Sequence, residues 1–137
     1  MRLLFSRAAA ITVLIFESTA LLSQPPEPRQ GIAVEMIPSA PHAAEMRAAD
    51  EANAVVVAIT VGGRVFVGIT PTEPTSLSSL NAKRVFVKAD RRVPLETMLT
   101  VLDALRGKSV VLLTAPPEGA AKVRNAPAYG TEIAVAR

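Results

Sequence analysis

The segment from residue 84 to residue 114 constrains the fold most, because two β-type runs flank one amphipathic helical run there. Residues 84–89 (RVFVKA) predict a half-buried strand, and residues 109–114 (SVVLLT) form the apolar run of a buried strand. Between them, Pro94 suits the first turn of a helix and Gly107 suits its end. The apolar positions of this helix form one broad stripe, made of Leu95, Met98, Leu99, Val101, Leu102 and Leu105.

Two further β-type runs precede this segment. Residues 55–61 (VVVAITV) and 64–67 (RVFV) flank Gly62 and Gly63, which predicts a hairpin with a tight turn. A short helix is expected over residues 75–80, with its first threonine as the N-cap. The element order β-β-α-β-α-β predicts a small α/β domain (α+β, two layers), with the helices on one face of the sheet.

The first 24 residues predict a membrane anchor. Arg2 and Arg7 precede an apolar run over residues 8–22, an order that favours insertion with the following chain outside the cytoplasm. The run is short, because about 15 helical residues span about 22 Å while the hydrocarbon core is about 30 Å thick. Three interpretations stay open: a single transmembrane helix, a signal peptide cleaved near residues 18–20, and a misplaced start codon.

The rest of the chain divides by composition. Residues 25–53 are rich in proline and alanine and favour an extended extracytoplasmic linker, in which residues 31–37 (GIAVEMI) have the weak alternation of a short strand. The folded domain is expected over residues 54–117. Residues 118–137 form a tail, in which residues 131–136 (TEIAVA) predict a C-terminal edge strand.

The composition excludes several classes of function. The chain has no cysteine and a single histidine, His42, which lies in the proline-rich stretch, so we expect no metal site. The net charge is only +3, and one tyrosine without tryptophan offers no ladder of stacking aromatics, so nucleic-acid binding is not expected. No catalytic triad, carboxylate pair or P-loop is present, so we expect neither a cofactor nor an enzyme.

A few polar residues remain as candidates for binding. Asp90, Arg91 and Arg92 form either a binding patch or, as we favour, the solvated turn before the helix, with the carboxylate near its N-terminal dipole. Asp103 is expected to be exposed on the helix face opposite the leucines. Tyr129 is either a contact residue or a loop aromatic that covers the core.

Several short motifs in this order resemble the ExbD/TolR family of biopolymer transport proteins. They are residues 85–94 (VFVKADRRVP), 101–106 (VLDALR) and 110–114 (VVLLT). Residues 55–67 resemble the family's opening hairpin, and residues 13–22 (VLIFESTALL) are similar to the end of its single transmembrane helix. Each motif alone is weak, but their order is specific.

The resemblance implies a role in a proton-driven motor of the bacterial inner membrane. Such a protein crosses the membrane once, places its C-terminal domain in the periplasm and forms a homodimer. Its expected partners are a polytopic membrane protein of the ExbB/TolQ type and a TonB- or TolA-like protein that acts on the outer membrane. Transport at the outer membrane would then be driven by the proton motive force.

The residues that would handle protons depart from the family. The family's helix has one aspartate, at a position that is Arg7 in this sequence, and arginine does not deprotonate in a protein. Glu17 is the only carboxylate of the segment and is therefore the candidate proton-coupling residue. The alternative function is a non-energised exported module, for binding or scaffolding, that kept the fold and lost proton coupling.

Overall fold

A computed structural model describes residues 31–119 and 128–135. The expected membrane anchor, with Arg7 and Glu17, lies outside these ranges. Over the part of the chain that the structure describes, no helix has the length and apolar character needed to cross a membrane.

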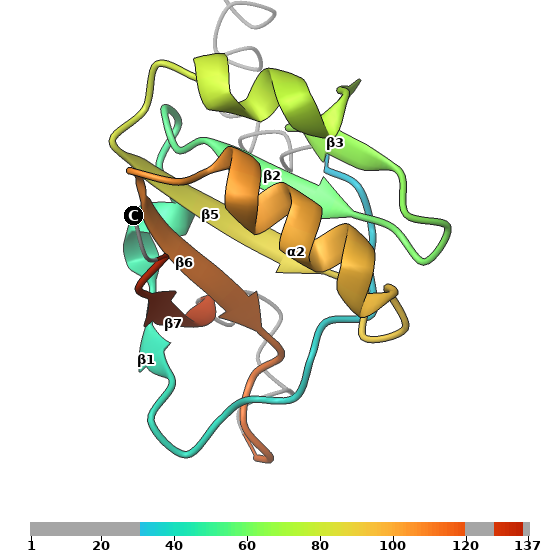
Figure 1. Ribbon diagram of the computed structural model, residues 1–137. Helices are drawn as coiled ribbons and strands as arrows, with labels where there is room; N and C mark the ends of the chain where they lie inside the picture. Colours follow the sequence, from blue (N-terminus) through green and yellow to red (C-terminus); the bar gives the residue numbers. More distant parts are fainter. Residues whose placement is uncertain (1–30, 120–127, 136–137) are drawn as a thin grey trace, which may run out of the picture.

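The described residues form a mixed sheet of seven strands with few helices (Figure 1), so the α/β class is confirmed. The sheet order is β1-β7-β6-β5-β2-β3-β4. The three central strands β6, β5 and β2 are parallel, and the outer pairs are antiparallel. The strands are β1 (Ala44–Glu45), β2 (Val56–Ile59), β3 (Val65–Val67), β4 (Thr70–Pro71), β5 (Arg84–Ala89), β6 (Ser109–Thr114) and β7 (Tyr129–Ile133).

Two helices lie on the face of the sheet that is turned to the viewer in Figure 1. They are the 3-10 helix η2 (Pro74–Ser79) and the α-helix α2 (Leu95–Ala104). Leu77 of η2, together with Val101 and Leu105 at the end of α2, packs on Val85 and Val87 of β5, and all five side chains are fully buried. α2 begins after Pro94 and ends before Gly107, which has a φ of 84°, as the sequence predicts.

The opposite face of the sheet is also covered, which the sequence did not predict. The 3-10 helix η1 (Arg47–Asp50) places Ala49 against Phe86, Val111 and Leu113, so the helices are not all on one face. Because both faces are covered, Val85, Phe86 and Val87 are all buried, and the prediction of a half-buried strand at β5 was wrong. The three consecutive apolar residues are typical of a strand buried on both sides.

Residues 31–53 lie along the sheet instead of extending away from it. The nitrogen of Arg91 donates to the carbonyl of Glu35 at 2.8 Å, and the nitrogen of Ala115 donates to the carbonyl of Ile37 at 2.8 Å. Met36 forms an isolated bridge to Asp90, so the short strand expected over residues 31–37 is reduced to a single bridge. These bonds join the expected linker to the ends of β5 and β6.

Two further elements differ from their predicted form. η2 begins at Pro74 with Glu73 as its N-cap, so the predicted cap at Thr75 was wrong, since proline suits the first helical position better. β7 begins at Tyr129, two residues before the expected start, and β1 pairs with Tyr129 and Gly130 on its outer side. Only the part of β7 beyond Gly130 is therefore an edge.

Gly130 allows the close approach of β1 and β7 to the sheet. A Cβ atom built there would lie 2.9 Å from the carbonyl oxygen of Leu112, 2.9 Å from Cγ1 of Val111 and 3.1 Å from Cγ of Met46. Real Cβ atoms essentially never come within 3.0 Å of such atoms. A glycine is therefore required at residue 130, where Leu112, Val111 and Met46 leave no space for a Cβ atom.

Candidate docking surface

The apolar positions of α2 form two stripes in different environments. Val101 and Leu105 face the sheet and are fully buried, with Met98 packed against the same core. Leu95 and Leu99 are 72% and 55% exposed, although the sequence placed them in one core-facing stripe. The stripe is wider than the surface that the sheet offers, so Leu95 and Leu99 stay exposed, and Leu99 faces β7 across a groove.

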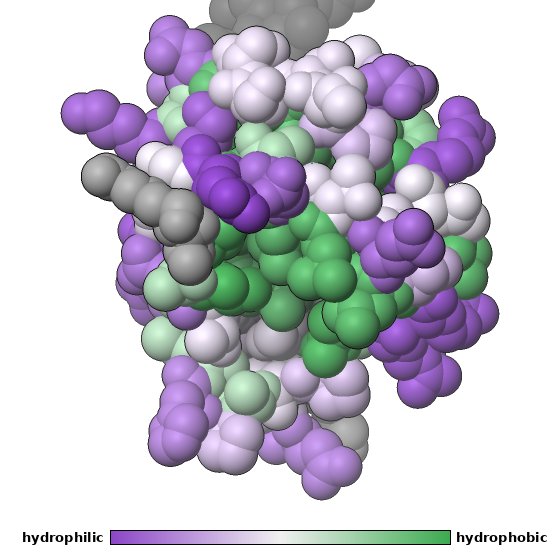
Figure 2. Space-filling view, in the orientation of Figure 1, coloured by the Kyte–Doolittle hydropathy of each residue, from purple (hydrophilic) through white to green (hydrophobic). Residues whose placement is uncertain are grey.

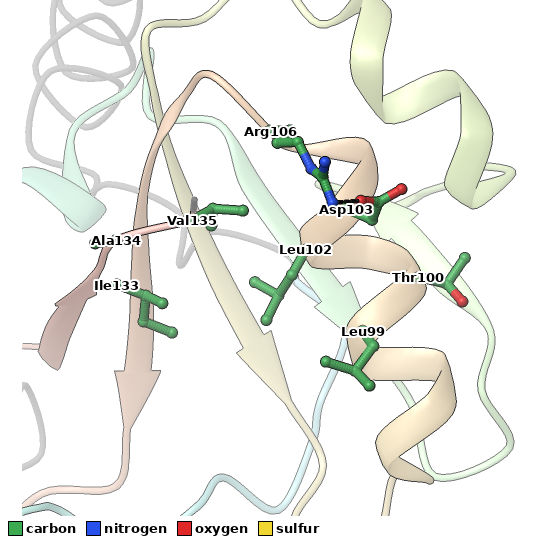
Figure 3. A pocket seen from close by; sticks show the side chains of 8 residues that line it. All are labelled: Leu99, Thr100, Leu102, Asp103, Arg106, Ile133, Ala134 and Val135. Atoms are coloured by element: carbon green, nitrogen blue, oxygen red, sulfur yellow. Dashed lines mark ion pairs between the residues drawn. The ribbon is translucent and has the colours of Figure 1, made fainter. Parts of the chain in front are cut away.

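A groove of about 590 Å³ separates Leu99 and Leu102 of α2 from β7 and the residues that follow it. In Figure 3, Leu99 and Leu102 from α2 point toward Ile133 and Val135 on the other side of the groove. An apolar area lies at the middle of the same face in Figure 2. The groove is lined by Leu99, Thr100, Leu102, Asp103, Arg106, Ile133, Ala134 and Val135.

Charged side chains line one rim of this groove. Asp103 forms an exposed ion pair with Arg106, drawn as a dashed line in Figure 3. Asp103 is exposed, as expected, but it borders the groove next to Leu99 and Leu102 instead of lying opposite the leucines. Exposed ion pairs stabilise a fold little. The pair therefore limits the apolar area at one end without adding much to the stability of the helix.

The strand on the other side of the groove has an open edge beyond Gly130. β6 lies on its inner side, and β1 pairs only with Tyr129 and Gly130 on its outer side. Within the described ranges no strand pairs with the outer side of Thr131–Ile133. Thr131 Oγ1 is also buried without a hydrogen-bond partner among the described residues. An open edge beside an apolar groove is suited to bind another chain.

The charged turn before α2 is occupied internally. The Asp90 carboxylate accepts from Arg92 Nε at 2.9 Å and Nη2 at 3.1 Å, and from the backbone nitrogens of Arg92 at 3.0 Å and Glu35 at 3.2 Å. Arg91 Nε contacts Glu35 Oε1 at 2.9 Å. Hydrogen bonds from the Arg92 side chain and backbone hold the pKa of the Asp90 carboxyl well below its usual range.

These contacts favour the turn over the binding patch, with one correction. Asp90 is 5% exposed and is not solvated. Its carboxylate is bonded to Arg92 and to the backbone of Glu35 instead of to the first turn of α2. Asp90 thus fastens the segment around Glu35 to the end of β5.

The other candidate residues do not come together. His42 is exposed in the turn before β1, and no group of metal-binding side chains exists among the described residues. Tyr129 is half-buried at the start of β7, so its placement in a loop was wrong. Arg7 and Glu17 lie outside the described residues.

Comparison with protein-family models and with curated proteins finds no match to this chain. Its function is therefore inferred from its own residues. Sequence reasoning missed the exposed surface of α2, although one signal was available. Leu95, Leu99 and Leu102 repeat at i, i+4 and i+7, and Met98, Val101 and Leu105 repeat at i, i+3 and i+7, which makes two adjacent stripes.

Proposed function

We propose that this protein is a single-pass component of a transport complex of the bacterial inner membrane that is driven by the proton motive force. It would resemble ExbD/TolR proteins and would help to energise a TonB- or TolA-like protein that acts on the outer membrane. Its partners would be a polytopic protein of the ExbB/TolQ type and a second copy of itself. We propose no enzymatic activity and no cofactor.

The observation that carries the proposal is the order of motifs over residues 85–114. The strand, charged turn, helix and strand of these motifs correspond to β5, the turn at Asp90, α2 and β6. An exposed apolar groove beside α2 is a further supporting feature, since a transport accessory without catalytic groups would act by binding proteins.

A second candidate function is favoured by one residue of the sequence. Arg7 occupies the position of the family's aspartate, and an arginine cannot exchange protons at physiological pH. The chain would then be a non-energised module that docks proteins at the periplasmic side. The two candidates share the fold and the groove and differ in the role of Glu17.

The test uses the full chain, co-expressed with a polytopic partner of the ExbB/TolQ type. We expect the two to co-purify from detergent, and we expect Glu17→Gln and Glu17→Ala to abolish transport that depends on the proton motive force. Full transport with both variants would contradict proton coupling by Glu17 and would support the second candidate. Failure to co-purify would contradict the motor function itself.

A further inference from the structure

We propose that the outer edge of β7 pairs antiparallel with β7 of a second copy of this chain, with Ile133 on the dyad axis. The inference rests on the homodimer of the proposed function. It adds the place of contact and the register of the two strands.

The backbone of β7 can accept a strand beyond Gly130. The nitrogen of Met46 donates to the carbonyl of Ala128, so the backbone groups of Ala128 point outward, toward β1. In an antiparallel ladder the backbone groups of alternate residues point toward opposite neighbours. Those of Glu132 and Ala134 therefore point outward as well, past the end of β1, while those of Thr131 and Ile133 point toward β6.

The side chains favour the register about Ile133 over the two registers nearer to Gly130. Pairing about Ile133 sets Thr131 opposite Val135 of the second copy and Glu132 opposite Ala134, so no like charges meet. Pairing about Glu132 would set two carboxylates directly opposite each other, which is destabilising. Pairing about Thr131 would need the outer edge of Tyr129, which β1 already occupies.

The same register joins the apolar surfaces of the two copies. In an antiparallel pair, opposite residues project from the same face of the sheet, so both α2 helices lie on one side. Ile133 and Val135 of the second copy then continue the apolar floor of the groove beside Leu99 and Leu102. Pairing would also satisfy the outward backbone groups of Glu132 and Ala134 and remove an exposed edge.

The absence of cysteine from the sequence makes the register directly measurable. Residues opposite each other in a non-hydrogen-bonded antiparallel pair have Cα atoms about 4.5 Å apart, within the range of about 4.4–6.8 Å that a disulfide needs. Single cysteines are placed at residues 131 to 135 of the full chain, in membranes of expressing cells, and oxidised. A matched control is Ile69→Cys, because Ile69 is 55% exposed beside β4 at the far edge of the sheet.

We expect Ile133→Cys to give the highest yield of disulfide-linked dimer, at least about tenfold above Ile69→Cys, since only opposed residues meet the geometric limits. A maximum at Ala134→Cys or Glu132→Cys would overturn the register, and yields equal to the control at every position would overturn the contact. If Ile133→Cys does not accumulate, co-expressed Thr131→Cys and Val135→Cys chains test the same register, because these two residues are opposed across the strands.

Co-purification with the polytopic partner separates this inference from the proposed function. A variant set that co-purifies normally and does not cross-link at β7 contradicts the strand pairing alone. Cross-linking at Ile133 supports the pairing even where the polytopic partner does not co-purify, in which case the motor function fails and the contact between copies stands.

Discussion

The two apolar stripes of α2 belong to one helix but lie in different environments. Val101 and Leu105 are fully buried over the central strands, whereas Leu95 and Leu99 are 72% and 55% exposed, and Leu99 borders the groove beside β7. The difference arises because α2 is the last helix on its side of the sheet within the described ranges, with no helix over β7 (Figure 1). A helix at the border of a layer can therefore serve the core with one stripe and a partner with the other.

The largest expected effect comes from the buried stripe. Leu105→Ala removes a fully buried side chain and should lower the free energy of unfolding by about 2–5 kcal/mol. Leu95→Ala is the matched control on the same helix and should change it by less than about 0.5 kcal/mol. Urea denaturation of the full chain in detergent micelles, followed by circular dichroism, measures both values. Equal losses would show that the two stripes do not differ.

The next largest loss of stability is expected for a substitution in β7, the strand across the groove from Leu99. Gly130→Ala adds a Cβ atom 2.9 Å from backbone and core atoms and should cost about 1–3 kcal/mol of unfolding free energy. Gly62→Ala is its control, because a Cβ atom there meets nothing within 4 Å and its φ is not positive. The same denaturation experiment compares them. A larger loss for the Gly62 variant would contradict the placement of β7 against Met46.

The last effect concerns the turn before α2, and its size depends on pH. The pKa of Asp90 is lower in the folded chain than in the unfolded chain, so its contribution to stability is complete above the unfolded pKa of about 3.9 and is lost as the pH falls below it. Asp90→Asn should remove part of this acid-dependent loss. Denaturation midpoints measured from pH 6 to about pH 3 test this expectation. Asp103→Asn, which changes an exposed pair, should leave the profile unchanged.

The sequence predicts the elements whose signals are local. β5 and β6 span the predicted residues 84–89 and 109–114, because β-type runs bounded by turn residues need no distant partner to be recognised. α2 lies between Pro94 and Gly107 for the same reason. The helical period of the apolar residues can be recognised in the sequence, and so can the proline and the glycine at the two ends of the helix.

The elements that the sequence did not predict are held by distant contacts. β1 is two residues long and exists because Ala44 and Glu45 meet Gly130 and Tyr129. β4 is equally short and contains Pro71, which weakens a strand pattern in the sequence but is tolerated in an edge strand. The segment around Glu35 looked like a spacer because its partner, Asp90, is distant in the sequence.

The candidate docking surface was predictable only in part. The apolar residues of α2 were identified, but which of them the sheet covers depends on where β7 lies and on the absence of a further helix over it among the described elements. The edge strand was predicted over residues 131–136, while its shielding by β1 at Gly130 was not. Whether a side chain of α2 is exposed depends on how the sheet and the helices pack together, so the local sequence pattern of the helix does not predict it.

Pairing of β7 with β7 of a second copy would set Leu99 beside the contact between chains and outside the core. The most direct measurement compares Leu99→Ser in two assays of the full chain: cross-linking through Ile133→Cys, and urea denaturation in an Ile133→Lys background, where association does not contribute. We predict a lower yield of cross-linked dimer and an unfolding free energy within about 0.5 kcal/mol of the background. A loss of stability comparable to that of Leu105→Ala, with the cross-linked yield unchanged, would contradict the claim.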